Sequence, residues 1–218
     1  MRRRTCCIGA SALAALPLAR AWGASASPMA LAEATANAAT PDVSTPDTQQ
    51  AALALLRRAG GGLVVVMRHA LAPGTFDPPG FVAGECGTQR NLGDEGRAQA
   101  RSIGAWYRAR QLVPTAVRSS AWCRCLDTAL LAFGRVQPWP PLDSMLRDPA
   151  RRDAQPALLR AELARRARAD APGFEVWVTH QVNITALAGG FADSGDAVLL
   201  RHDSARDVPA VLASLRIA

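Results

Sequence analysis

After its first 26 residues, the sequence has no apolar run long enough to cross a bilayer. It also lacks the charge surplus of a nucleic-acid-binding protein, although the formal net charge is +7. Four of the 25 basic residues lie in the first 26 positions, where Asp and Glu are absent. The remaining 21 basic and 18 acidic residues leave a dispersed surplus of +3. We therefore expect no nucleic-acid partner and no stable membrane insertion.

Those first 26 residues have the layout of an export signal. A basic start precedes an apolar run from Cys6 to Leu18, and Ala24-Ser25-Ala26 supplies small residues for cleavage. The arginine cluster also permits a twin-arginine route, and a retained N-terminus on a cytoplasmic protein is the alternative. We predict a signal peptide at 1–26 and a periplasmic or secreted location. Residues 27–49 are rich in Ala, Thr, Pro and Ser, which predicts a flexible leader before a domain at 50–218.

Cysteine is scarce beyond the signal, where only Cys86, Cys123 and Cys125 remain. The Cys-x-Cys pair has no second pair at ligand spacing, so a four-ligand zinc site is not supported and we expect no metal or other cofactor. In an oxidising compartment Cys86 would pair with Cys123 or Cys125, because cysteines at i and i+2 rarely bond to each other. Buried, unpaired cysteines are the alternative.

Apolar runs and helical periodicities alternate along the rest of the chain, which predicts an α/β three-layer sandwich with a mostly parallel, mixed sheet. The predicted strands are Leu63–Met67, Ala116–Arg118, Phe174–Thr179, Ala197–Arg201 and Val211–Ile217. The predicted helices are Gln50–Ala59, Asp94–Gln111, Trp122–Phe133, Pro156–Ala169 and Val182–Ala188. We find no internal repeat.

Two of the predicted strands end at a histidine. Arg68-His69 follows one and Thr179-His180 follows another, while Ser119-Ser120 and then Arg124 follow a third. A single histidine at a strand end usually has a structural role. Because the carboxyl ends of such strands converge at one edge of an open sheet, we expect these groups to share a crevice. A cluster of imidazoles and guanidiniums repels itself unless an anion binds there.

Phosphate fits this requirement. Guanidinium groups bind its oxygens in pairs, and a helix N-terminus adds positive field. Histidine supplies a nitrogen nucleophile near neutral pH. One histidine would be phosphorylated while the other, protonated, stabilises the charge on the transferred phosphoryl group. This chemistry requires no metal.

Four motifs occur in series between residues 62 and 201. They are Arg68-His69-Ala70; Leu92, Gly96, Gln99 and Ala100; Ser120, Arg124, Thr128 and Ala129; and His180. In these motifs the sequence resembles the histidine phosphatase superfamily, also called phosphoglycerate mutase-like. The resemblance implies that His69 is the nucleophile, that Arg68 and Arg124 grip the phosphate, and that His180 assists them. Alanine at position 70, where the family usually has glycine, is a mild departure.

The proton donor to the leaving group is less well defined by the resemblance. Family members often place this carboxylate in a Leu-x-Glu context, for which Leu146-Arg147-Asp148 is the nearest counterpart. We therefore assign Asp148 as the donor. Asp143 in the same loop, Glu85 in another loop, and the absence of any dedicated acid remain open.

Residues 73–91 form a loop that would lie over the crevice, and its density of polar side chains is high for a connector. We expect Arg90 and Asn91 to bind substrate there, held in place by a disulfide at Cys86. Gln181 could donate to the phosphate or cap the following helix. His202 falls outside the motifs and is expected at the surface.

These residues predict a histidine acid-type phosphatase, a metal-independent phosphomonoesterase acting through phosphohistidine at His69. Its partner would be a small phosphorylated substrate, and analogy with exported family members suggests a sugar phosphate of the cell envelope. The alternative is a catalytically weak or inactive domain of the same fold that binds a phospholigand but lacks a proton donor.

Overall fold

The computed structural model describes residues 46–146 and 148–217. Within them a six-stranded sheet has the strand order β3-β2-β4-β1-β5-β6. The strands are β1 (Val64–Arg68), β2 (Ala116–Ser119), β3 (Gln137–Pro138), β4 (Glu175–Thr179), β5 (Ala197–Asp203) and β6 (Val208–Leu215). The first four run parallel, while β5 is antiparallel to β1 and β6 is antiparallel to β5. The predicted mixed, mostly parallel sheet is confirmed.

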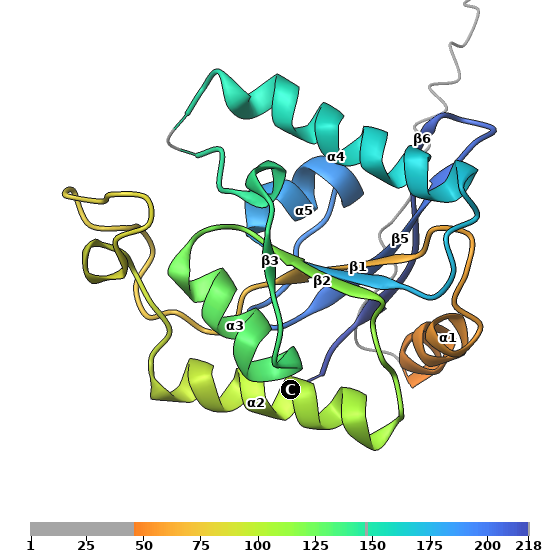
Figure 1. The fold of residues 1–218 in the computed structure, drawn as a ribbon, viewed down its shortest axis with the longest axis horizontal. Helices are drawn as coiled ribbons and strands as arrows, with labels where there is room; N and C mark the ends of the chain where they lie inside the picture. Colours follow the sequence, from red (N-terminus) through yellow and green to blue (C-terminus); the bar gives the residue numbers. More distant parts are fainter. Residues whose placement is uncertain (1–45, 147, 218) are drawn as a thin grey trace, which may run out of the picture. The chain divides into compact units, whose positions relative to one another are not determined.

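Helices cover both faces of this sheet, as the prediction requires (Figure 1). One face packs against α1 (Pro46–Arg57), α2 (Asp94–Ala109) and α3 (Cys123–Phe133), the other against α4 (Arg151–Arg168) and α5 (Gln181–Ala188). Successive side chains of a strand point to opposite faces. In β1, Val65 and Met67 accordingly join the core under α1–α3, whereas Val64 and Val66 join the core under α4 and α5.

Some element boundaries differ from the sequence-based expectation. Helix α1 begins at Pro46, so residues 46–49 of the predicted leader are helical. Helix α4 begins at Arg151 and contains Pro156, which removes one backbone donor but does not start the helix. Strand β3 was not predicted, because two residues are too short to show a period. The predicted signal peptide and the rest of the leader lie outside the described residues.

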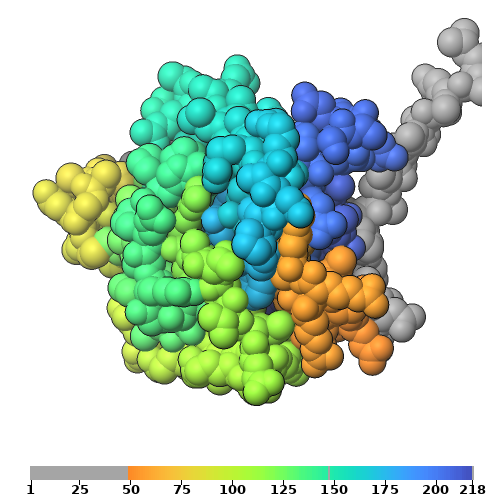
Figure 2. Space-filling view, turned by 45° about the vertical axis from the view of Figure 1, so that its right-hand side comes forward, coloured from red at the N-terminus to blue at the C-terminus, as the bar shows by residue number. Residues whose placement is uncertain are grey.

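The loop between β1 and α2 projects beyond the C-terminal end of β1. It is drawn in yellow at the left of Figures 1 and 2. We call residues 73–91 the lid.

Among residues 46–146 and 148–217, no helix combines the length and apolarity needed to cross a membrane.

Candidate active site

Three strand ends bring the predicted residues together. His69 directly follows β1, and His180 follows β4 as the N-cap of α5. Ser120 directly follows β2. The ring centroids of the two histidines lie 5.5 Å apart, with the ring planes inclined by 68°. The prediction that both imidazoles meet at one edge of the sheet is therefore confirmed.

Arg124, in the first turn of α3, joins the two histidines. Its Nε donates to His69 Nε2 at 3.2 Å, and its Nη2 donates to His180 Nδ1 at 3.4 Å. The arginine residue is only 4% exposed. A single buried guanidinium therefore contacts one nitrogen of each ring.

The bonds of His69 define which nitrogen is free to react. Its Nδ1 lies 2.8 Å from the carbonyl oxygen of Ala70, and a carbonyl only accepts, so Nδ1 carries the proton. Burial lowers the pKa of His69 to about 3, and the positive charges of Arg124, Arg90 and Arg68 act in the same direction. At neutral pH the ring is therefore uncharged, and Nε2 carries the lone pair, which accepts from Arg124 Nε in the resting protein.

His180 is also held neutral in the resting protein, whereas the sequence predicted a protonated ring during phosphoryl transfer. Burial lowers its pKa well below the usual value, and His69 and Arg124 add to the effect. Since Nδ1 accepts from Arg124, Nε2 carries the proton and donates to Ser120 Oγ at 2.9 Å. Ser120 in turn donates to Asp143 Oδ1 at 3.1 Å. A chain of hydrogen bonds thus fixes the orientation of the ring.

The motif residues of α2 and α3 hold the backbone beside His69. The amide of Ala70 donates to Thr128 Oγ1 at 3.0 Å, and Thr128 donates to the carbonyl of Arg124 at 2.6 Å. The amide of Leu71 donates to Gln99 Oε1 at 2.9 Å. A Cβ on Gly96 would lie 1.9 Å from the Leu71 carbonyl oxygen, so only glycine permits this approach of α2. These contacts fix His69 relative to Arg124.

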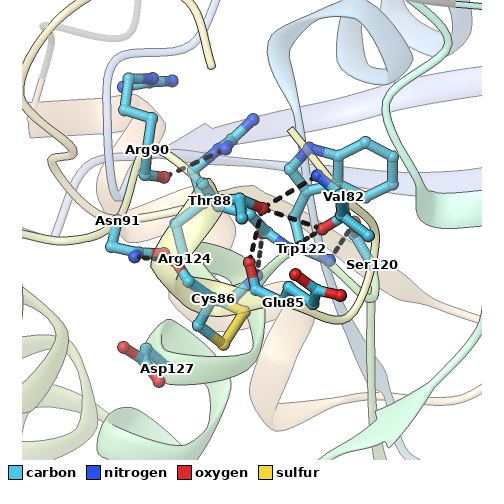
Figure 3. The surroundings of a disulfide bond; sticks show 12 residues. Val82, Glu85, Cys86, Thr88, Arg90, Asn91, Ser120, Trp122, Arg124 and Asp127 are labelled. Carbon is cyan, nitrogen blue, oxygen red and sulfur yellow. Dashed lines mark hydrogen bonds between the residues drawn. A yellow bond between two sulfur atoms is a disulfide. The ribbon is translucent and has the colours of Figure 1, made fainter. Parts of the chain in front are cut away.

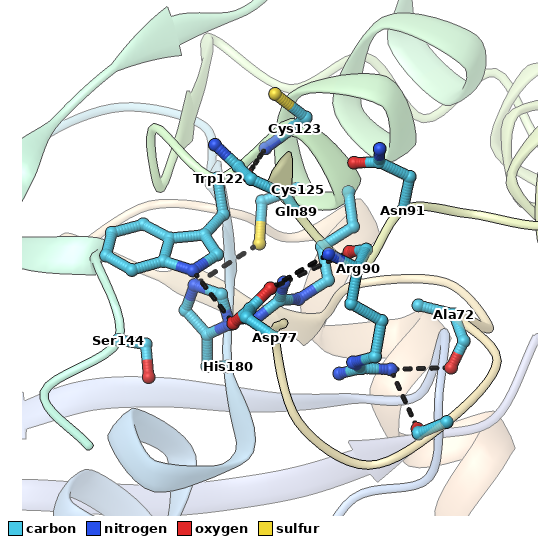
Figure 4. Close-up of polar contacts among 12 residues, drawn as sticks. Ala72, Asp77, Gln89, Arg90, Asn91, Trp122, Cys123, Cys125, Ser144 and His180 are labelled. Atoms are coloured by element: carbon cyan, nitrogen blue, oxygen red, sulfur yellow. Dashed lines mark hydrogen bonds and ion pairs between the residues drawn. The ribbon is translucent and has the colours of Figure 1, made fainter. Parts of the chain in front are cut away.

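Asp77 of the lid is a site residue that sequence reasoning missed. Arg124 donates to it through both terminal nitrogens, Nη1 to Oδ1 at 2.7 Å and Nη2 to Oδ2 at 3.3 Å. The amide of Arg90 and the indole Nε1 of Trp122 also donate to this carboxylate, at 3.0 and 3.3 Å (Figure 4). The sequence predicted that an anion would lie beside the basic cluster. It did not identify Asp77 as that anion, because Asp77 is 47 positions from Arg124.

A disulfide between Cys86 and Cys123 ties the lid to the start of α3 (Figure 3). This confirms the expected pairing of Cys86 and selects Cys123 as its partner. Gln89 strengthens the attachment by accepting from the Cys123 amide at 2.9 Å. Cys125 is free and buried, with Sγ 3.6 Å from His180 Nε2, and burial raises the pKa of its thiol to about 12.

A pocket of about 270 Å³ opens beside these groups. It is lined by Thr75, Phe76, Asp77, Arg90, Trp122, Arg124, Ser144, Leu146, His180, Gln181 and Val182. Asp77 is the sole carboxylate among these lining residues. His69 is 3% exposed and lies next to Arg124 without lining the pocket. The site therefore combines a nitrogen nucleophile, a guanidinium fork and a cavity for a small ligand.

Comparisons of the whole structure find the same architecture in proteins of known structure. A candidate alpha-ribazole-5'-P phosphatase from Escherichia coli superimposes with a TM-score of 0.50 at 16% identity, covering 72% of this chain and 98% of that one. The phosphoserine phosphatase of Entamoeba histolytica, in complex with 3-phosphoglyceric acid, gives 0.51 at 12% identity, covering 71% and 96%. The described residues therefore share the α/β fold of these two phosphatases. No protein-family model and no curated protein sequence matches the chain.

At these identities the likeness establishes the fold alone, because one fold can carry different chemistries. Arg90, Arg124, His180 and Gln181, all predicted site residues, line the pocket. The Nη1 atom of Arg90 donates to the carbonyls of Ala72 and Gly74, at 2.5 and 3.2 Å. These bonds connect the two ends of the lid.

Three of the predicted phosphate or substrate contacts differ in the structure. Arg68 donates to the carbonyl of Ala192 at 2.9 Å and lines a different cavity, next to α2. Asn91 donates to the carbonyl of Cys86 at 2.6 Å and does not line the site pocket. The side-chain amide of Gln181 bonds to Thr185 and Gly190, so its donors are already used within the protein.

The carboxylates considered as proton donors are not pocket-lining residues. Asp148 is half exposed, accepts from the amide of Ala150 and pairs with Arg151, so the structure does not bring it to the pocket. Glu85 is exposed in the lid. Asp143 is buried beneath Ser120, and burial raises the pKa of its carboxyl group.

His202 was expected at the surface, and the structure places it at a partly buried position of β5. Its Nε2 is 3.4 Å from Oδ1 of Asp207, and its backbone pairs with Pro209 of β6. It lies outside the site pocket.

The two neutral histidines should make the protein sensitive to acid. Their native pKa values lie below the unfolded value of about 6.5, so as the pH falls below that value the unfolded chain binds protons that the native protein does not. Each imidazole then lowers the free energy of unfolding by up to about 1.4 kcal/mol per pH unit. Denaturant unfolding between pH 7.5 and 5 should therefore show a weaker pH dependence for His69→Gln than for wild type. Equal slopes would contradict a neutral His69.

Proposed function

We propose that this protein is a phosphomonoesterase that works through a phosphohistidine intermediate on His69. The observation that carries the proposal is the position of Arg124. Its guanidinium touches the lone-pair nitrogen of His69, touches His180, and holds a carboxylate in a two-pronged ion pair. The same fork geometry binds phosphate oxygens. An anion-binding group therefore stands directly beside a neutral nucleophile.

In the first step His69 Nε2 attacks the phosphorus in line, the N–P bond forms, the P–O bond breaks, and the leaving oxygen takes up a proton to depart as the alcohol. Arg124 stabilises the negative charge on the phosphoryl oxygens, because the guanidinium is already placed where that charge develops. Binding of the dianion beside His180 raises the pKa of this imidazole. In the second step water attacks the phosphorus, the N–P bond breaks, and inorganic phosphate is released.

An unsatisfied donor in the pocket supports an anion there. The Nε atom of Arg90, which lines the pocket, is buried without a hydrogen-bond partner among the described residues. The charge of this guanidinium lowers the pKa of His69 and of His180. A buried donor without a partner costs about 1–3 kcal/mol, so an added acceptor is favourable.

The test is a comparison of an aryl and an alkyl phosphate as substrates, with EDTA present throughout. We expect inorganic phosphate release from both, because the proposed chemistry uses the side chains of the protein. Hydrolysis of the aryl ester alone would indicate that no proton donor operates, since an aryl leaving group departs without one. Phosphate binding with hydrolysis of neither ester would favour the alternative, a phospholigand-binding domain.

We also propose that the protein is exported to the periplasm or secreted, and that it acts on a sugar phosphate of the cell envelope. The basic and apolar pattern of residues 1–26 supports export, as does the Cys86–Cys123 disulfide. Mass spectrometry of the protein from the periplasmic fraction should find an N-terminus near residue 27. A full-length cytoplasmic protein would contradict export.

A further inference from the structure

We propose that Asp77 is the catalytic carboxylate of this site: it occupies the phosphate position in the resting protein, is displaced by substrate, and then protonates the leaving group. The proposal rests on the phosphomonoesterase function proposed above. It assigns to the lid a residue that takes part in the reaction, in addition to residues that cover the pocket.

Asp77 and a substrate phosphate compete for the same donors. Arg124 Nε is 3.2 Å from His69 Nε2, so a phosphorus within reach of this nucleophile brings its oxygens against the same guanidinium. Both terminal nitrogens of that guanidinium are bonded to the oxygens of Asp77, at 2.7 and 3.3 Å. The two carboxylate oxygens thus occupy the positions on Arg124 that two phosphate oxygens would take, and a substrate phosphate has to displace Asp77 from Arg124.

Asp77 stays near the pocket when it is displaced. The lid is fixed nine positions further along, where Cys86 is bonded to Cys123, the residue next to Arg124. Trp122, which donates to Asp77, is also next to Cys123 and lines the pocket. The disulfide therefore limits Asp77 to a local movement that keeps its carboxylate near the pocket, which Asp77 lines in the resting protein.

The proton affinity of Asp77 changes when phosphate replaces it on Arg124. In the resting protein burial opposes ionisation, but the hydrogen bonds from Arg124, the Arg90 amide and Trp122, together with the charge of Arg124, outweigh it and hold the pKa of Asp77 below its usual range. A bound phosphate neutralises Arg124 and places negative charge near the carboxylate. Both changes raise the pKa of Asp77, so it takes up a proton from the solvent or from a substrate monoanion.

Protonated Asp77 then completes the transfer. As His69 Nε2 forms its bond to phosphorus and the P–O bond breaks, the Asp77 proton moves to the leaving oxygen and the alcohol departs neutral. In the second half-reaction the Asp77 carboxylate accepts a proton from water as the water oxygen bonds to phosphorus and the N–P bond breaks. After phosphate leaves, Asp77 loses this proton to solvent and returns to Arg124.

The experiment compares wild type with Asp77→Asn, which removes the charge and keeps the shape. Glu85→Gln is the matched control, because it removes the same charge from an exposed position of the same lid. For Asp77→Asn we expect inorganic phosphate, titrated by calorimetry, to bind about tenfold more tightly, since the competing carboxylate is gone. We expect kcat for an alkyl phosphate to fall by about 100-fold or more, and kcat for an aryl phosphate to fall by far less.

Phosphate binding that is unchanged or weaker in Asp77→Asn would overturn the proposal, as would an equal loss of kcat for both esters. A second measurement does not depend on the variant. The indole N–H signal of Trp122 in wild type should shift in a nitrogen–proton NMR spectrum when phosphate is added, because its acceptor moves away. A signal that stays in place also counts against displacement. Failure of the phosphomonoesterase function itself would appear separately, as a wild-type protein that cleaves neither ester.

Discussion

Replacement of His69 by Ala is expected to lower kcat for any phosphomonoester by about 10³-fold or more, because the variant has no nitrogen to accept the phosphoryl group. Loss of the imidazole leaves Arg124 and His180 in place, so inorganic phosphate should still bind. The measurement is initial-rate hydrolysis of an aryl phosphate, combined with acid-labile labelling of the protein by a phosphorylated substrate.

The matched control is His202→Ala, which removes another imidazole from a strand and leaves the pocket intact. It should retain wild-type rates once folding is confirmed by circular dichroism. If His69→Ala kept its activity, the proposed nucleophile would be wrong, whatever the substrate.

The second large effect is expected for Arg124→Lys. Lysine keeps the positive charge but offers one ammonium group in place of a planar fork, so it cannot contact both imidazoles and the two oxygens of Asp77 together. We expect kcat/KM to fall by about 10²–10³-fold, the range for removal of a donor that stabilises charge in the transition state. Steady-state kinetics with an aryl phosphate measures the loss.

For comparison, Arg97→Lys changes an exposed arginine that pairs with Asp127 on the neighbouring helix. This variant should behave as wild type, because exposed ion pairs contribute little. Similar rates for Arg124→Lys and Arg97→Lys would mean that the fork at Arg124 is dispensable, and would remove the main support for the proposed mechanism.

The strand ends were predictable because burial leaves a strong local signal. The apolar run before His69 and the one before His180 are covered on both faces of the sheet, so their ends could be located within about one residue. The glycine, glutamine and threonine of the helix motifs could also be recognised, although their purpose could not. The structure shows that Gly96, Gln99 and Thr128 hold the backbone next to His69.

The sequence predicted the disulfide of Cys86 but not its partner. Compartment and spacing left Cys123 and Cys125 as possible partners of Cys86. In a helix, residues two apart point about 200° away from each other. Cys123 faces the lid, and Cys125 is buried against His180. The orientation of α3 makes this choice, and that orientation depends on how the helix packs on the sheet.

The sequence by itself determined the order of the five helices and of every strand except β3, the mixed sheet, and the presence of two histidines and an arginine at one end of the strands. These follow from local patterns of burial. Only the tertiary structure decided that both imidazoles are neutral, that Arg68 turns toward another cavity, and that Asp77 lies on Arg124. Each of these depends on groups far apart in the chain, since charge and desolvation act through space and leave no period in the sequence.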